Sequence, residues 1–245
     1  MQEEVQSSGF IREVRLNRQK VPAFNKYPYN IPSISEINQL SLHPAVTFFV
    51  GENGSGKSTL IEAIAILAGF NPEGGTKNFR SRLRPSESSL HQHLKLIRNA
   101  KREKTGFFLR AETMFNVSTE IEKGGYTEYG WESLHIRSHG EAFLWLMQNR
   151  FSSDGLYVLD EPESALSPQR QLATLRLIHE LSSQGSQFII ATHSPILLAF
   201  PNATIYALNE NGIQETVYTD TEHYQVTRDF LVNHELMLKH LLDLR

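Results

Sequence analysis

The octapeptide GENGSGKS, residues 51–58, limits the possible folds of this chain more than any other stretch. It follows an apolar run, AVTFFV, and precedes apolar residues at helical spacing, so it is expected to join a buried strand to a helix. Its glycines let the backbone curl until successive N–H groups face an anion, and the helix N-terminus adds positive potential. In the pattern G-x-x-x-x-G-K-[ST], the lysine supplies charge to the outer phosphates and the hydroxyl can bind Mg²⁺. The predicted nucleotide-binding residues are Gly51, Glu52, Asn53, Gly54, Ser55, Gly56, Lys57, Ser58 and Thr59.

Apolar runs alternate with helical patterns along most of the chain. Runs typical of strands lie at 106–112, 156–159 and 188–192. Between the last two, Ser167 and Pro168 predict a helix start that runs to a stop at Gly185. Wholly apolar strands separated by helices are typical of a mostly parallel sheet covered on both faces, hence of the α/β class. Asn211-Gly212 indicates a hairpin turn, and a helix is expected from Glu222.

Length and composition favour one soluble, cytoplasmic domain that spans residues 1–245. The 245 residues suffice for a sizeable core, and no apolar stretch is long enough to span a membrane. The N-terminus lacks the apolar segment of a signal peptide. The chain has no cysteine, which excludes disulfides, thiolate zinc sites and a cysteine nucleophile. Residues 113–137 are poorly patterned, and we expect a helical or insertion lobe within residues 77–150.

The segment 77–104 is strongly basic. It carries nine lysines and arginines against two glutamates, although the whole chain has a net charge of -3. Such a segment can meet an anionic partner, and nucleic acid is one candidate. A solvated helix face with no partner is the alternative. The basic residues are Lys77, Arg80, Arg82, Arg84, Lys95, Arg98, Lys101, Arg102 and Lys104.

Two carboxylates, Asp160 and Glu161, end the apolar run LYVL. Carboxylates at the end of a buried strand are costly without a cation, and Mg²⁺ held beside the phosphate loop would offset that cost. Asp160 is placed to hold the Mg²⁺ shell. Because strand side chains alternate, Glu161 is expected to point elsewhere and to act as general base toward a water. The alternative for Glu161 is a carboxylate that only faces solvent.

His193 follows the next apolar run, FIIAT. In an open parallel sheet, ligands gather at the carboxyl ends of the strands. Lys57, Asp160 and His193 all follow predicted strand ends, so we expect them to share one edge. A neutral histidine there can hydrogen-bond a γ-phosphate or the attacking water, whereas the alternative is a capping or core histidine.

The order GENGSGKS, RSHGEA, VLDEPESALS, ATHS resembles that of the ATP-binding-cassette (ABC) ATPases. Ser138 precedes Asp160 by 22 residues, and His193 follows it by 33. The form DEPE followed by Ser-Pro is more similar to RecF, SMC and OLD-type ATPases than to transporter subunits. FIREVRLNR, GFNPEGGTKNF, FFLRAE, SHGE and EHYQVTRDFL resemble a group of short, stand-alone bacterial ATPases of predicted AAA-family or ABC-like type.

The resemblance implies an ABC-type fold, with an N-terminal antiparallel β portion and a short helical signature insertion. It also implies Mg-ATP hydrolysis, with Lys57, Glu161 and His193 catalytic and Ser58 and Asp160 holding Mg²⁺. By position Glu112 takes the place of the family's glutamine loop, a further metal contact. Ser138 and Gly140 match a divergent signature motif, which in the family binds the γ-phosphate held by a partner subunit. An ATP-dependent head-to-tail homodimer follows, although Ser138 could instead be a simple helix cap.

Three functions remain open at this stage. The first is a soluble ATP-driven switch in DNA or RNA maintenance or defence, with an unidentified protein partner possible. The second is the nucleotide-binding subunit of a membrane transporter, which the divergent signature and Ser167 disfavour. The third is a P-loop kinase, which accounts neither for the signature-like stretch nor for Glu161. None of the aromatics before the phosphate loop, Phe10, Phe24 or Tyr27, stands out from sequence as an adenine-stacking residue.

Overall fold

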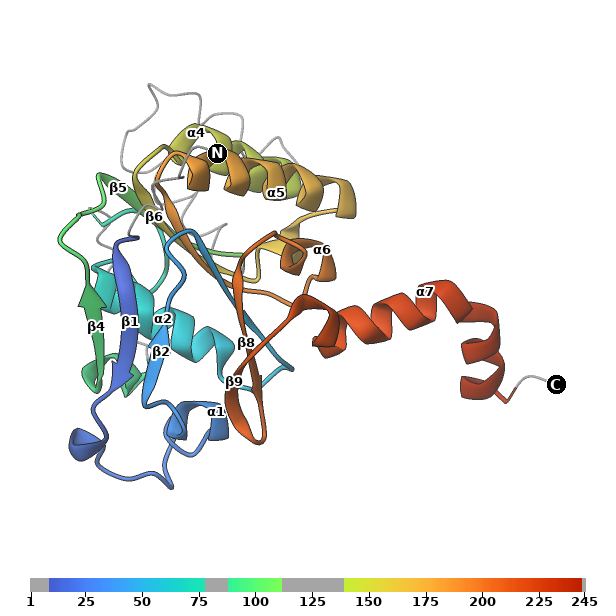
Figure 1. Cartoon of the computed structure of the whole chain (residues 1–245), viewed down its shortest axis with the longest axis horizontal. Helices are drawn as coiled ribbons and strands as arrows, with labels where there is room; N and C mark the ends of the chain where they lie inside the picture. Colours follow the sequence, from blue (N-terminus) through green and yellow to red (C-terminus); the bar gives the residue numbers. More distant parts are fainter. Residues whose placement is uncertain (1–8, 78–87, 112–138, 244–245) are drawn as a thin grey trace, which may run out of the picture.

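A computed structural model describes residues 9–77, 88–111 and 139–243. Its centre is a six-stranded sheet (Figure 1). The strand order is β5-β6-β7-β3-β8-β9, and every neighbouring pair is parallel except β8 with β9. This confirms the predicted parallel α/β sheet and its terminal hairpin. The strands are β3 (Val46–Val50), β5 (Thr105–Arg110), β6 (Gly155–Asp160), β7 (Gln187–Ala191), β8 (Thr204–Asn209) and β9 (Gly212–Thr216).

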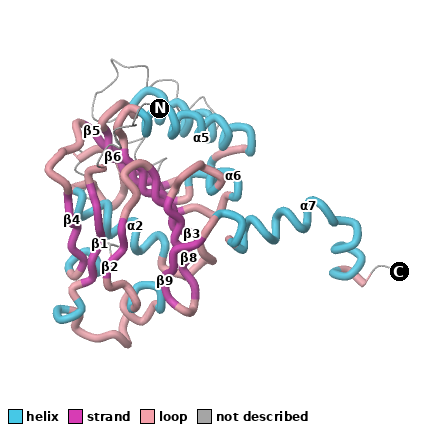
Figure 2. Tube along the Cα trace, in the orientation of Figure 1, coloured by secondary structure: helices cyan, strands magenta, loops and turns pink. Residues whose placement is uncertain are grey.

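A second, antiparallel sheet has the order β2-β1-β4, which confirms the predicted N-terminal β portion (Figure 2). It consists of β1 (Ile11–Leu16), β2 (Gln39–Ser41) and β4 (Leu94–Arg98). Gln187 of β7 ties this sheet to the large one. Its buried amide accepts from the N–H groups of Phe10 and Ile11 at 2.8 and 2.9 Å and donates to the carbonyl of Ile11 at 2.8 Å. Because β4 and β5 both belong to sheets, much of the described part of residues 77–150 is not helical.

Alternation along the large sheet's strands separates two apolar cores. Phe49 and Phe108 point into the core shared with α2 (Lys57–Ala68) and the small sheet. Their neighbours Phe48 and Phe107 point into the opposite core, under α4 (His139–Arg150) and α5 (Pro168–Ser183). Figure 1 shows α2 between the two sheets and α4 and α5 on the far side. The large sheet is therefore buried on both faces, as its uninterrupted apolar strands predict.

The element boundaries follow local chemistry, with small corrections to the predictions. α2 ends at Ala68, and the residue at its C-cap, Gly69, has a φ of 96°, which suits a residue without a Cβ. α5 begins at Pro168 with Ser167 at the N-cap, but the Ser167 side chain makes no capping hydrogen bond, and the helix ends at Ser183. The hairpin pairs Asn209 with Gly212, so the turn residues are Glu210 and Asn211, one position earlier than predicted.

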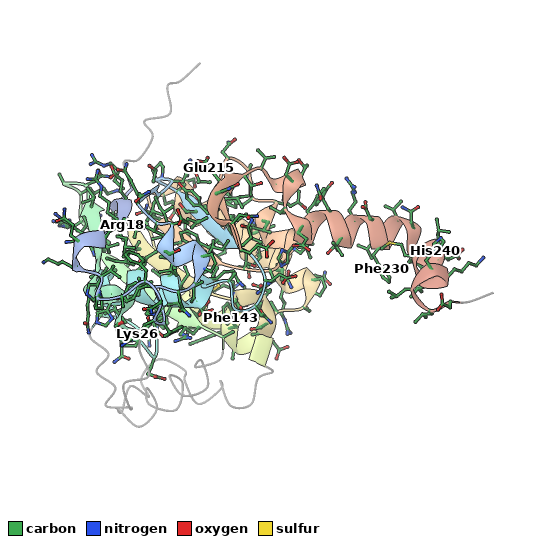
Figure 3. The ribbon with its side chains drawn as sticks, turned by 90° about the horizontal axis from the view of Figure 1, so that it is seen from below. Arg18, Lys26, Phe143, Glu215, Phe230 and His240 are labelled. Carbon is green, nitrogen blue, oxygen red and sulfur yellow. The ribbon has the colours of Figure 1, made fainter. Side chains whose placement is uncertain are left out.

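The predicted C-terminal helix, α7 (Glu222–Leu241), projects away from the body (Figure 1). None of its residues is buried, and Asn233 has non-helical dihedrals that kink it. Figure 3 shows the α7 residues Phe230 and His240 well outside the body. The short helical segments are α1 (Pro32–Ser35), α6 (Pro195–Leu198), η1 (Arg18–Lys20), η2 (Ser89–Gln92), η5 (Pro162–Ala165) and η6 (Tyr218–Asp220).

Candidate nucleotide site

The carboxyl ends of β3, β7 and β6 lie side by side and bring the predicted site residues together. β7 pairs with both of the other strands, so the phosphate loop after β3, Asp160 at the end of β6 and His193 after β7 share one edge. Two of the pockets that open there are lined by Glu161. One of about 410 Å³ is lined by Lys57 and Glu161, and one of about 500 Å³ is lined by Glu161 and His193.

The phosphate loop needs glycine at two of its positions for different reasons. Gly56 has a φ of 98°, which is a left-handed conformation that disfavours side chains. Gly51 lies so close to the next strand that a Cβ there would come within 2.2 Å of the Leu208 carbonyl oxygen. The loop therefore turns into α2 while pressed against β8, a type of turn in which backbone N–H groups can bind an anion.

The Lys57 side chain is folded over this loop. Its Nζ donates to the carbonyls of Gly51 and Glu52 at 2.8 and 2.9 Å, and the residue is only 3% exposed. Burial lowers the pKa of Lys57, while the carboxylates of Glu161, Asp160 and Glu163 act in the opposite direction. A cation held this way can turn from neutral carbonyls to an incoming anion with little rearrangement.

Ser58 and Asp160 supply two hard oxygen atoms at the same place. The Ser58 hydroxyl donates to Asp160 Oδ1 at 3.1 Å, and Asp160 is buried. Mg²⁺ in nucleotide sites takes one or two protein oxygens and completes its shell with water and phosphate. The described residues contain no cluster of three or more His, Asp or Glu that could hold a metal alone. The pair therefore suits a metal that arrives with phosphate.

Arg110, at the end of β5, is a site residue that sequence reasoning missed. Its Nη1 donates to Glu62 Oε2 of α2 at 2.9 Å, and its Nε lies 3.5 Å from Asp160 Oδ2. Arg110 thus lies near the Asp160 oxygen that does not accept from Ser58. A charged residue closing an apolar strand, as in TGFFLR, was the available signal. The predicted metal contact Glu112 lies outside the described residues.

Glu161 leaves the strand direction, though not for the predicted reason. β6 ends at Asp160, and Glu161 has φ 49° and ψ 53°, so a left-handed turn rather than strand alternation redirects it. Its N–H donates to the Ala191 carbonyl at 3.0 Å. Its Oε1 lies 3.3 Å from His193 Nε2, and the side chain is 33% exposed, which leaves the carboxylate open to the pocket.

A third carboxylate, Glu163, holds the backbone at His193. It accepts from the Thr192 hydroxyl at 2.8 Å and from the His193 N–H at 2.5 Å. Burial raises the pKa of Glu163, against the effect of these hydrogen bonds. Sequence reasoning missed this role, although Glu163 is the second glutamate of DEPE. The segment after β6 is thereby tied to the segment after β7.

His193 also contacts His223, the second residue of α7. Nδ1 of His193 lies 2.9 Å from Nε2 of His223. Burial, followed by the nearby Lys57 charge, lowers the pKa of both imidazoles. The stretch EHYQVTRDFL, which resembles the family, contains His223, but it assigned this histidine no role because thirty residues separate it from its partner.

Unsatisfied polar atoms gather at this edge. Among the described residues, four buried side-chain atoms lack a hydrogen-bond partner, and three of them belong to Ser55, Arg110 and His193. Buried polar atoms are normally paired, so this grouping indicates a place for a polar ligand. It is the observation that most directly fits the residues to a bound nucleotide phosphate.

The structure describes Gly140, one of the two residues that match the signature motif. Ser138 lies outside the described residues. Gly140, in the first turn of α4, packs so closely that a Cβ would come within 2.4 Å of the Ala165 carbonyl oxygen. Gly140 lies against Ala165 and Arg170, and not in the pocket that Lys57 and Glu161 line.

One of the three candidate aromatics lies at the nucleotide pocket. Phe10 is fully buried in a core, and Phe24 packs edge-on against Tyr29. Tyr27 is 63% exposed, lines the pocket with Lys57, and has its hydroxyl 3.2 Å from Thr59 Oγ1. Tyr27 is therefore the best placed of the three to meet a base or ribose.

Most of the described basic residues in segment 77–104 are already paired. Lys77 and Arg98 form ion pairs with Glu103, and Lys101 and Lys104 form ion pairs with Asp154. The two lysines lower the pKa of Asp154 to about 2. These partners reduce the charge left for an anionic ligand, and Arg80, Arg82 and Arg84 lie outside the described residues.

A known protein family matches the region of the chain that contains this site. The family described as "AAA domain, putative AbiEii toxin, Type IV TA system" matches residues 46–136 and 142–199, more than half of the chain. The chain belongs to this family. It is an ABC-type P-loop ATPase domain, as the sequence resemblance implied. The matched region contains the phosphate loop, Asp160, Glu161 and His193, whereas α7 lies beyond it.

Curated relatives of this ATPase domain are distant. L-arabinose transport ATP-binding protein AraG of Geobacillus stearothermophilus is 25% identical over 92% of this chain and 46% of its own length. DNA replication and repair protein RecF of Colwellia psychrerythraea is 43% identical over 22% of this chain and 12% of its own. The chain spans about half the length of the first curated relatives it matches.

The SMC head domain from Thermotoga maritima is similar in structure, with a TM-score of 0.47 and 17% identity over 85% of this chain and 98% of that one. In the part of this chain that the structure describes, no helix combines the length and apolar character needed to cross a membrane.

Proposed function

We propose that this domain binds Mg-ATP and hydrolyses it at the edge formed by β3, β6 and β7. The convergence of Lys57, the Ser58–Asp160 pair and the Glu161–His193 pair on one set of pockets carries the proposal. A P-loop kinase needs no carboxylate at the position of Glu161, and the pairing of Glu161 with His193 favours hydrolysis over that alternative.

Each residue has a role that its surroundings support. The loop N–H groups and Lys57 hold the β- and γ-phosphates, and Tyr27 packs against the base or ribose. Ser58 and Asp160 would hold Mg²⁺, which when bound would supply charge neutralisation for the phosphates. Glu161 Oε1 accepts the proton of the attacking water, and His193 Nε2 donates toward the γ-phosphate. Glu112 and Ser138 remain candidate contacts.

We further propose that ATP pairs two chains head-to-tail, each closing the other's site with Ser138 and the start of α4. The exposure of Tyr27 and Glu161 supports this, because the pocket is open on one side. Gly140 lets α4 press against Ala165, four residues after Glu161, so a partner docked on α4 would bear on the segment that holds the proposed base. In a two-fold pair the γ-phosphate is the group that reaches both chains, and its loss opens the pair.

Light scattering of Glu161→Gln tests this pairing. The variant keeps the side-chain shape and removes the base, so we expect turnover to fall about 10²–10⁴-fold and a dimer to accumulate with Mg-ATP but not with Mg-ADP. Adding Ser138→Arg puts bulk and charge at the shared phosphate and should return the mass to a monomer. A Glu161→Gln protein that stays monomeric with Mg-ATP at tens of micromolar would refute the role in trans, since contacts of roughly 10⁻⁵ M are visible there.

The coupled process is proposed as a switch in DNA or RNA maintenance or defence. The short RecF match supports maintenance, and the family description, which names a toxin of a type IV TA system, supports defence. Copurification with a permease would instead favour the transporter alternative, which relatives such as AraG support. Nucleic-acid binding through segment 77–104 stays a prediction, and its signature would be retention that falls steeply with salt.

A further inference from the structure

The contact between His193 and His223 has a direction that the surrounding groups fix. With 2.9 Å between Nδ1 of His193 and Nε2 of His223, one hydrogen lies between the two nitrogens. Two hydrogens would collide, and two bare nitrogens would repel. Either His223 donates to His193, or His193 donates to His223.

The second ring nitrogen of His193, Nε2, decides between these two hydrogen-bond directions. Its Nε2 is buried, makes no hydrogen bond among the described residues, and faces Glu161 Oε1 at 3.3 Å. If a neutral His193 donated through Nδ1, its bare Nε2 would face a carboxylate oxygen, lone pair against lone pair. If His223 donates, Nε2 of His193 keeps its hydrogen and faces that oxygen favourably.

A doubly protonated His193 could donate through both nitrogens, but its surroundings disfavour this state. Burial and the nearby charge of Lys57 lower the pKa of His193, against the attraction of Glu161. The charges around His223 are those of Lys57, Glu222 and Glu52. The arrangement consistent with the contacts of both ring nitrogens is a neutral His193 that carries its hydrogen on Nε2 and accepts at Nδ1 from His223.

We propose that His223 is a positioning residue that holds His193 in the Nε2–H form, so that its N–H points into the pocket beside Glu161. The value of this for catalysis rests on the proposed ATPase function, in which that N–H meets the γ-phosphate. The direction of the hydrogen bond does not depend on that function. His223 stands in the first turn of α7, so this contact is also where the projecting helix reaches the nucleotide edge.

The direct test is ¹⁵N NMR of the full-length, histidine-labelled chain without nucleotide. Protonated and bare ring nitrogens differ widely in ¹⁵N shift, and loss of signals in His193→Gln assigns the ring of interest. We expect a bare Nδ1 and a protonated Nε2 in the wild type and in His223→Gln, whose amide N–H can replace that of His223. In His223→Glu, a carboxylate acceptor should move a hydrogen to Nδ1. A wild-type Nδ1–H, or no change in His223→Glu, would overturn the proposal.

Steady-state ATP turnover provides a second readout. His223→Ala should lower kcat about tenfold, the scale of one hydrogen bond, with the KM for ATP nearly unchanged. His223→Gln should restore most of the rate, and His234→Ala, an exposed histidine of the same helix, should match the wild type. Wild-type kcat in His223→Ala would overturn the positioning role. An inactive wild type would contradict the ATPase function alone, because the spectra would still decide the hydrogen-bond direction.

Discussion

Helices α2 and α7 both begin at the nucleotide edge, but the body holds them very differently. α2 starts with Lys57 and has eight of its 12 residues buried, between two sheets. α7 brings His223 in its first turn, yet none of its 20 residues is buried. It exposes Val226, Phe230, Leu231, Val232, Leu236, Met237 and Leu241. One helix is thus fixed along its length by packing, and the other is attached at one end by a few polar contacts and a short interface.

The largest expected effect on folding lies in α2. Ile64 is fully buried in the core that α2 shares with both sheets. Ile64→Ala should reduce the free energy of unfolding by about 2–5 kcal/mol, through lost burial and the cavity left behind. Urea denaturation followed by circular dichroism measures this. Ile64→Val, the matched smaller truncation, should cost about 0.5–1.5 kcal/mol. A loss below about 2 kcal/mol for Ile64→Ala would show that α2 is not packed as described.

An intermediate effect is expected at the attached end of α7 and depends on pH. Burial lowers the pKa of His193 and His223 below the ordinary value of 6.5. The unfolded chain therefore binds more protons than the folded one just below pH 6.5, and stability should fall as the pH drops through that window. His223→Gln should flatten this dependence in denaturation curves from pH 7.5 to about 5.5. His234→Gln, farther along α7, should leave the slope of stability against pH unchanged. An equal flattening by both variants would contradict the difference between the attached start of α7 and its projecting part.

The smallest effect is expected on the exposed face of α7. Val232 and Leu236 are 72% and 58% exposed. Changing both to Ser should alter the free energy of unfolding by no more than about 0.5 kcal/mol per site. The same denaturation assay measures it. A loss comparable to that of Ile64→Ala would mean that this face is covered in solution, and the contrast between the helices would fail.

The sequence anticipated the nucleotide edge because its residues follow strand ends. Apolar runs marked β3, β6 and β7, and parallel topology then required Lys57, Asp160 and His193 to meet at one edge. The glycine spacing of the loop carried its own conformational requirement, which Gly56 meets with a left-handed backbone. Local pattern and topology were sufficient for these residues.

The same reasoning could not find residues that join the site through long-range packing. Arg110 and Glu163 lie within the quoted stretches FFLRAE and DEPE, but strand register and the left-handed turn at Glu161 determine that they meet Asp160 and Thr192. His223 reaches His193 because of where α7 leaves η6, which no periodicity encodes. The exposure of α7 was equally hidden, since apolar helical spacing predicts a helix and not whether the body has room for it.

ATP turnover in the wild type and in Lys57→Ala, assayed as phosphate release with and without Mg²⁺, tests whether the nucleotide edge is an ATPase site. The buried Lys57 ammonium is the cation folded over the loop, so its removal leaves the phosphates without that charge. We expect Mg²⁺-dependent turnover in the wild type, lost on chelation, and turnover at background in Lys57→Ala with an unchanged unfolding midpoint. Turnover of Lys57→Ala at the wild-type rate, or a folded wild type that releases no phosphate, would contradict an ATPase site at this edge.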